Sequence, residues 1–335
     1  MNTNHQTDHG TAPSVSATGA VASGRQLKAH GVTPAVIAER CRPGGPWRQV
    51  LPGVYLLRQG PLSSEERVEA ALLYAGRDPG AHGPVGGGRE AVVTGPAALA
   101  LHRFAAVPPL RGMPVIDVLV PFQRRLRDAG DVAVHRVRAL PRPQDVGGMP
   151  CAPVPRALAD ALRRLDDAET VRRLLVEAVR AGHCDPAAVL AELSAAGVLE
   201  RPQVAAAVPA LIAAGRTMAE QRLYAMVRCH HLPDPVWNVE LRLPGGPPLG
   251  GVDAYWPEHA VAVAVDTRTE ALDDAAVEAR YTRQRERLEA LGITLIRLTP
   301  AELRGSLDQR ATVVRTALVA SAERTPAAYV VVTPR

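Results

Sequence analysis

The stretch that decides the fold reads LGGVDAYWPEHAVAVAVD at residues 249–266 and resumes as GITLIRL at residues 292–298. Short apolar runs bounded by Gly and Pro predict strands in this part of the chain, at residues 236–243, 250–255, 260–266, 293–298 and 329–332. A long charged helix is expected over residues 273–291, and a helix capped by Thr217 is expected before the first strand. This order of elements predicts a mixed sheet with a helix on each side.

Acidic residues lie where adjacent strands of this sheet would display them together. Asp253 lies within the second predicted strand, Asp266 ends the third, and Glu220 lies on the preceding helix. Hydrolysis of a phosphodiester needs a divalent metal ion held by hard oxygen ligands, which carboxylates supply. We therefore take Glu220, Asp253 and Asp266 as candidate catalytic residues, with Asp253 and Asp266 as the candidate ligands of Mg²⁺.

The same region resembles the very-short-patch-repair-like branch of the restriction-endonuclease superfamily, whose core carries a PD-(D/E)XK motif. The resemblance rests on Glu220 and on four further segments, at residues 253–257, 261–266, 280–287 and 292–297. It implies a restriction-endonuclease-like α/β/α domain over residues 216–335.

Three departures from the family's pattern bear on catalysis. Ala264 stands where the family has glutamate, Thr267 stands where it has glycine, and no lysine follows Lys28. Alanine offers no metal ligand, and no lysine is present to activate a water molecule. The resemblance therefore implies a degenerate nuclease fold. The alternative is a Mg²⁺-dependent DNA endonuclease that still cuts with the three acids.

The predicted long helix is rich in arginine, with Arg283 and Arg287 as candidate DNA contacts. Arg285 and Glu289 are four residues apart, a spacing at which oppositely charged side chains pair on a helix surface. A solvated, ion-paired face therefore competes with a phosphate-contacting one.

Composition sets broad limits on the whole chain. The length of 335 residues predicts two or three folded domains. The chain is 47% hydrophobic and 22% charged, and only 3% of its residues are aromatic. Scarce aromatics argue against single-stranded nucleic acid bound on stacking platforms. No signal peptide and no run of about 18 apolar residues occurs, so we expect a cytoplasmic protein without a membrane partner. The cysteines show no CxxC spacing, which argues against a zinc cage.

Positive charge is concentrated near the amino end. Between residues 21 and 60 there are six basic side chains and one acid, Glu39, whereas the whole chain has a formal net charge of +5. A local basic patch of this kind is typical of a phosphate-binding surface.

The elements predicted around this patch are those of a winged helix-turn-helix over residues 23–76. We expect a tail without structure over residues 1–22, a short helix at residues 26–30, a second helix begun by Thr33 and Pro34, and a hairpin at residues 47–57. The second helix would enter the major groove and the hairpin would touch the backbone of double-stranded DNA. The candidate contacts are Thr33, Arg40, Arg42, Arg48, Gln49 and Arg58.

This segment resembles the N-terminal domain of AbiEi-type antitoxins of type IV toxin–antitoxin systems. The resemblance rests on residues 31–33, Arg40, Trp47-Arg48 and residues 51–55. Beyond a linker at residues 77–89, the middle region resembles the domain that follows in those proteins, through residues 94–99, 115–118 and 135–136. The family implies a transcriptional regulator that binds DNA and a cognate toxin, gene or protein, as partner.

The middle region, residues 90–215, is predicted to be an α+β domain. Its helices are expected to stop at Gly182, Gly197 and Gly215. His102 and His135 have no partner that the sequence identifies, and Cys229-His230-His231 is interpreted as a helix end. The chain is thus expected to be α/β and multi-domain, and a protein-binding scaffold without nucleic acid is the further alternative.

Overall fold

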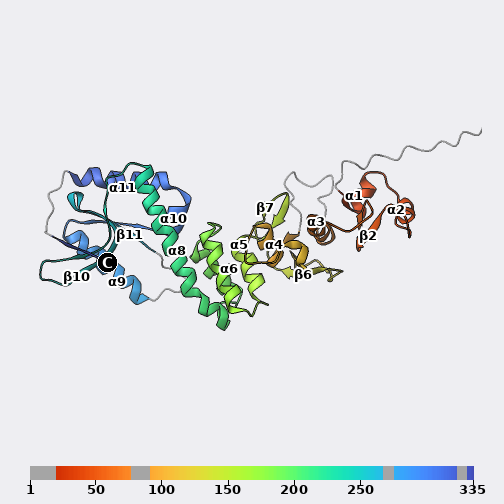
Figure 1. Ribbon diagram of the computed structural model, residues 1–335, viewed down its shortest axis with the longest axis horizontal. Helices are drawn as coiled ribbons and strands as arrows, with labels where there is room; N and C mark the ends of the chain where they lie inside the picture. Colours follow the sequence, from red (N-terminus) through yellow and green to blue (C-terminus); the bar gives the residue numbers. More distant parts are fainter. Residues whose placement is uncertain (1–19, 77–90, 267–274, 323–329) are drawn as a thin grey trace, which may run out of the picture. The chain divides into compact units, whose positions relative to one another are not determined.

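The computed structural model describes residues 20–76, 91–266, 275–322 and 330–335, and these form a mixed α/β protein with three sheets (Figure 1). The chain divides into two compact units, residues 1–157 and 158–335. Nearly all of the predicted tail, the whole linker at residues 77–89 and Thr267 lie outside the described residues.

The first unit begins with a three-stranded antiparallel sheet of order β1-β3-β2 and two short helices. Its elements are β1 (Val21–Ser23), α1 (Gly24–Ala29), α2 (Pro34–Arg40), β2 (Arg48–Leu51) and β3 (Val54–Leu56). A small core of Ala22, Leu27, Val32, Ile37 and Trp47 holds them together.

Side-chain caps explain where these two helices begin, and the folded chain begins earlier than the sequence predicted. Ser23 forms a capping box with Gln26, and the Thr33 side chain caps α2, as predicted, with Pro34 at its first position. Val21 and Ala22, which were assigned to the tail, instead form β1 with Ser23, because both side chains are buried and pair with β3.

The rest of the first unit contains α3 (Ser64–Ala75) and a five-stranded sheet of order β6-β5-β4-β8-β7. Its strands are β4 (Val92–Val93), β5 (Ile116–Pro121), β6 (Val132–Val137), β7 (Gln144–Val146) and β8 (Met149–Cys151), and α4 (Gly95–Leu101) and the 3-10 turn η2 (Leu110–Gly112) join them. Arg67 ties α3 to this part, since its guanidinium lies 2.6 Å from Asp131 and donates to the carbonyl oxygens of Leu110 and Met113.

The second unit opens with helices α5 (Val154–Leu162, which spans the division), α6 (Ala168–Arg180), α7 (Pro186–Ala195) and α8 (Pro202–Cys229). Gly182 and Gly197 follow helices with φ of 75° and 65°, as predicted for helix stops. The predicted stop at Gly215 and the predicted cap at Thr217 are wrong, because α8 runs through both.

The physical reason lies in packing between helices. A Cβ atom on Gly215 would lie 2.3 Å from Cγ of Pro186, so glycine is needed there for close approach of α7 to α8 and not for termination. Thr217 donates its hydroxyl to the carbonyl oxygen of Ala213 one turn earlier, a bond made inside a helix.

The remaining elements build a five-stranded sheet of order β12-β11-β10-β9-β13, in which β11 and β12 are parallel and the other neighbours are antiparallel. The strands are β9 (Val236–Arg242), β10 (Pro248–Trp256), β11 (Val261–Val265), β12 (Thr294–Leu298) and β13 (Val331–Pro334). Helices α9 (Ala275–Ala290), α10 (Pro300–Gly305) and α11 (Leu307–Ala322) and the 3-10 turn η3 (Pro257–His259) complete the unit.

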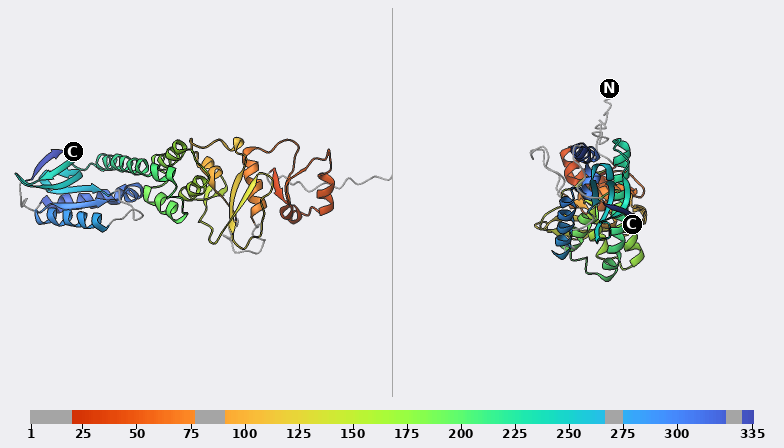
Figure 2. Two further views of the ribbon diagram at one scale, coloured as in Figure 1. Left: turned by 90° about the horizontal axis from the view of Figure 1, so that it is seen from below. Right: turned by 90° about the vertical axis from the view of Figure 1, so that its left-hand side faces the viewer.

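Two hydrophobic cores place helices on both faces of this sheet (Figure 2). One core joins α8, α10 and α11 to strands β10, β11 and β12, and the other joins α9 to strands β9, β10 and β11. The α-β-β-β-α-β order and the mixed sheet were predicted from the sequence. No helix in the described part of the chain is long and apolar enough to span a membrane.

Candidate nucleic-acid interface and acid-arginine pocket

Asp253 lies on β10 beside the strand that carries Ala264. Ala254 pairs with Val263 in an antiparallel register, which places Asp253 next to Ala264 on the neighbouring strand. The Asp253 side chain is buried, and its Oδ2 accepts the backbone N–H of Val265 at 2.6 Å. One carboxylate oxygen therefore links β10 to β11.

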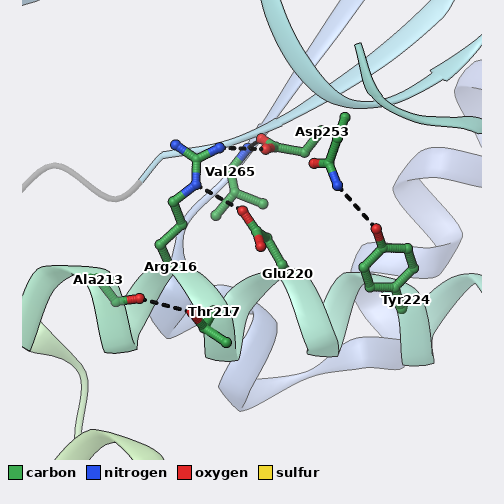
Figure 3. Close-up of polar contacts among 8 residues, drawn as sticks. Ala213, Arg216, Thr217, Glu220, Tyr224, Asp253 and Val265 are labelled. Carbon is green, nitrogen blue, oxygen red and sulfur yellow. Dashed lines mark hydrogen bonds and ion pairs between the residues drawn. The ribbon is translucent and has the colours of Figure 1, made fainter. Parts of the chain in front are cut away.

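Arg216 on α8 connects Asp253 to Glu220 (Figure 3). Its Nε donates to Oε1 of Glu220 at 2.8 Å, and its Nη2 donates to Oδ1 of Asp253 at 3.2 Å. The hydrogen bond to Glu220 and the charge of Asp253 hold the pKa of Arg216 above its usual value. The two predicted acids are thus brought together, with a guanidinium between them.

Asp266 directly follows Val265 at the end of β11 and is not among the residues that line the pocket described below. Its Oδ2 is 3.9 Å from Nη2 of Arg297, whose guanidinium lies over the Tyr281 ring at 5.0 Å. Its backbone N–H donates to the carbonyl oxygen of Leu298. The two residues proposed as a metal pair are therefore engaged with two different arginines.

These residues do not fit a divalent metal ion. Mg²⁺ requires near-octahedral oxygen ligands at about 2.0–2.1 Å, whereas Asp253 and Glu220 both direct oxygens at Arg216, and Ala264 supplies no oxygen. Within the described ranges, no three or more His, Cys, Asp or Glu side chains form a group that could hold a metal ion.

An open, polar pocket lies in front of Asp253. It lies between α8, the β9–β10–β11 part of the sheet and α9, and its charged or polar side chains are Arg216, Glu240, Asp253, Tyr281, Gln284, Arg287 and Arg335. Gly250 and Gly251 line the same wall, and the side chains of Gln284 and Arg335 lie against their backbone. Asp253 and Arg287 were predicted from sequence, whereas Arg216, Glu240, Gln284 and Arg335 were not.

The arginines of α9 divide between surface pairing and the pocket. Arg285 pairs with Glu289 at 3.6 Å, which confirms the ion pair predicted from their spacing. Arg283 is exposed on the helix surface, and Arg287 lines the pocket. The side chain of Arg280 lies outside the described residues.

Several predicted DNA contacts of the first unit have partners within the protein. The Thr33 hydroxyl caps α2, Arg42 pairs with Glu39 at 2.8 Å, and the Arg40 guanidinium lies 4.6 Å from the centre of the Trp47 ring. Arg58 contacts Glu66 at 2.6 Å and donates to the carbonyl oxygens of Gln59 and Pro61. Arg58 therefore holds the start of α3.

A second group of basic residues points into solvent. Arg25, Lys28 and Arg48 are exposed, and no carboxylate in the described part of the chain forms an ion pair with any of them. Gln49 is also exposed, and its side chain donates to the carbonyl oxygen of Leu51. Arg25 and Lys28 on α1 were counted in the basic patch, but the sequence did not select them as contacts.

The histidines examined in the sequence have structural partners. The His135 ring lies 2.7 Å from Oδ1 of Asp117, a buried acid on the adjacent strand. His135 therefore has a partner that the sequence did not identify. The His102 ring lies 3.2 Å from the carbonyl oxygen of Ala152. The helix end predicted at Cys229-His230-His231 is confirmed, because α8 ends at Cys229.

No protein-family model matches this chain, and no curated protein matches it.

The spacing of Arg216 and Glu220 in the sequence could have predicted their contact, but the helix break predicted at Gly215 hid it. Arg216 and Glu220 are four residues apart, the spacing at which an arginine and a glutamate meet on one helix face. The stop assigned to Gly215 placed Arg216 between helices, where that spacing has no meaning.

Proposed function

We propose that this chain is a DNA-binding transcriptional regulator of the antitoxin type, whose N-terminal part is a winged helix-turn-helix and whose C-terminal unit is a nuclease-like fold without metal-dependent cleavage. The observation that carries the proposal is the set of exposed cations on α1 and β2, Arg25, Lys28 and Arg48, which form no ion pair with a carboxylate among the described residues.

The helix pair has the dimensions of a helix-turn-helix. Four residues separate α1 from α2, and they include Gly31 with a φ of 79°. A short turn that contains glycine is typical of this motif, in which the second helix reads the major groove. Thr33 caps the start of α2, Arg40 is its last residue, and Arg42 follows two residues later.

The hairpin β2–β3 supports a role as the wing. Arg48 and Gln49 project from its exposed first strand, and Leu51, at the end of that strand, is buried. The contact of Arg40 with the Trp47 ring fixes the base of the hairpin next to the end of α2. Cations on α1 and on the hairpin could then bind phosphates on either side of the groove.

Fluorescence anisotropy with a labelled DNA duplex, measured across a series of salt concentrations, tests the DNA-binding half. Each lost phosphate contact lowers the slope of log K against log salt by about 0.9, so replacing Arg25, Lys28 and Arg48 with Ala should lower its magnitude by about 2 to 3. The matched control replaces Arg172, Arg173 and Arg180 of α6, which removes the same charge and should leave the slope nearly unchanged. An equal effect of the two triple variants would show that DNA is not bound at the helix pair and hairpin.

A plasmid-nicking assay tests the other half. We expect no cleavage by the wild-type chain with Mg²⁺ or Mn²⁺, since neither Ala264 nor the Arg216-bound acids offer a metal site. Cleavage that Asp253→Ala abolishes would instead establish the endonuclease that is the alternative function.

The regulatory role needs a separate readout in cells. A reporter gene placed behind the DNA upstream of this chain's own gene should be repressed by the wild type and not by the Arg25, Lys28 and Arg48 triple variant. Equal reporter output with both proteins would contradict regulation through this surface.

A further inference from the structure

Arg216 lies between two acids, Asp253 of the pocket wall and Glu220 on α8. Its guanidinium donates to one oxygen of Glu220 at 2.8 Å and to one oxygen of Asp253 at 3.2 Å. The second oxygen of Asp253 accepts the backbone N–H of Val265. Both oxygens of the buried acid are therefore already occupied by donors of the protein itself.

The helix α8 also fixes the position of the Arg216 guanidinium. Arg216 and Glu220 lie one turn apart on α8, so the helix itself sets their separation. The residue before Arg216 is Gly215, which packs against the ring of Pro186 and fixes the backbone of α8 at this point. A planar guanidinium can serve two carboxylates through separate N–H groups, which a lysine ammonium does with less directional precision.

In the described part of the chain, one carboxylate besides Asp253 lines the pocket. Ala264 lies next to Asp253 on the neighbouring strand and supplies no carboxylate. The other carboxylate of the pocket is that of Glu240. Access from solvent is open, since the Arg216 side chain is 44% exposed. A small cation can therefore reach the acids, and the positive charge of Arg216 opposes its binding.

We propose that Arg216 is a resident counter-ion that closes the Asp253–Glu220 pair to divalent cations, and that removing its charge turns the pair into a divalent-metal site. The inference deepens the non-catalytic half of the proposed function and is independent of DNA binding by the first unit.

Manganese titration followed by electron paramagnetic resonance tests this directly on the full chain. Since the acids are free only when the guanidinium is displaced, its removal should tighten Mn²⁺ binding by about tenfold or more. Arg216→Gln should therefore bind Mn²⁺ with a clearly lower Kd than the wild type. Arg228→Gln, which removes an exposed arginine of α8 that does not line the pocket, should behave as the wild type.

Two further variants connect the gained site to the acids. Arg216→Gln combined with Asp253→Asn should lose the Mn²⁺ binding that Arg216→Gln gains. Arg216→Lys keeps a cation near the pair and should bind Mn²⁺ no better than the wild type. Tight binding by Arg216→Lys or by the double variant would overturn the assignment.

Thermal denaturation covers the case in which Arg216→Gln is poorly folded. Mn²⁺ should then raise the melting temperature of Arg216→Gln and leave that of the wild type unchanged, because a ligand stabilises only a protein that binds it. The inference fails if Mn²⁺ leaves the melting temperature of Arg216→Gln unchanged, or if the wild type binds Mn²⁺ as tightly as the variant. A wild type that binds Mn²⁺ as tightly as Arg216→Gln but nicks no plasmid would refute this inference and leave the proposed function standing.

Discussion

At the scale of single residues, Asp253 is a structural acid as well as a site residue. Its two oxygens accept bonds from Val265 and Arg216, and its side chain is 7% exposed. Replacement by alanine leaves the partly buried backbone N–H of Val265 and part of the Arg216 guanidinium without an acceptor. Loss of a buried partner of this kind costs about 2–3 kcal/mol.

Urea denaturation of Asp253→Ala measures that loss in the free energy of unfolding. Asp234→Ala removes an exposed acid from the loop before β9 and serves as the control, with an expected change of less than about 0.5 kcal/mol. Equal stabilities of the two variants would mean that Asp253 contributes nothing beyond its charge.

Glu66 predicts a pH dependence of the first unit. Its carboxylate accepts the backbone N–H of Ser63 and contacts Arg58, both at 2.6 Å, and these interactions, the first the largest, hold its pKa below the usual value. A carboxylate with a lowered folded-state pKa stabilises the protein above its unfolded pKa of about 4.3, and this contribution is lost as the pH falls through the folded-state value.

Glu66→Gln should therefore be less stable than the wild type at pH 7, by about 1 kcal/mol, because charge-assisted hydrogen bonds become neutral ones. The difference should shrink to nothing in strong acid. Urea denaturation at a series of pH values checks this, and a difference that stays constant down to pH values well below 4.3 would contradict it.

At the scale of elements, the packing of α7 on α8 makes a prediction at Gly215. Alanine in a helix interior is favoured over glycine by about 1 kcal/mol. Here its Cβ would lie 2.3 Å from the Pro186 ring, and overpacking of this kind costs about 1–3 kcal/mol. Gly215→Ala should therefore destabilise the protein, and adding Pro186→Ala should recover part of the loss. A stabilised single variant would show that the two helices can separate without cost.

The elements that the sequence predicted well are those with local causes. The capped start of α2, the charged helix α9 and the strands around Asp253 follow from caps, periodicity and Gly-Pro punctuation. The errors at Val21 and Gly215 have one cause, since burial against β3 and close approach to Pro186 are tertiary facts. The short strand β7 was missed because its three residues, Gln144–Val146, carry no apolar pattern.

The site was predicted only in part, for the same reason. Periodicity and resemblance located Asp253 and Glu220, and the structure brings them to one guanidinium. The partners of Asp266 and His135, which are Arg297 and Asp117, lie on neighbouring strands. Strand neighbours depend on the order of strands in the sheet, and the sequence did not establish that order.

At the scale of the whole molecule, the division into two compact units predicts that the chain does not unfold in one step. The three tryptophans can report on the units separately, since Trp47 is buried in the first unit, and Trp237 and Trp256 contact the core around α8 in the second. Replacing Trp237 and Trp256 with Phe leaves a reporter of the first unit, and replacing Trp47 leaves reporters of the second.

In urea at pH 7, Glu66→Gln should shift the transition seen by Trp47, and Asp253→Ala should shift the one seen by Trp237 and Trp256. Substitutions that share no partners act independently, so each should leave the other transition within about 0.5 kcal/mol of its original position. Two-state behaviour requires that different probes give coincident curves. If both reporters gave one curve and each substitution moved it, the two units would unfold as a single cooperative body. Stability lost in the pocket would then also weaken the basic surface of the first unit.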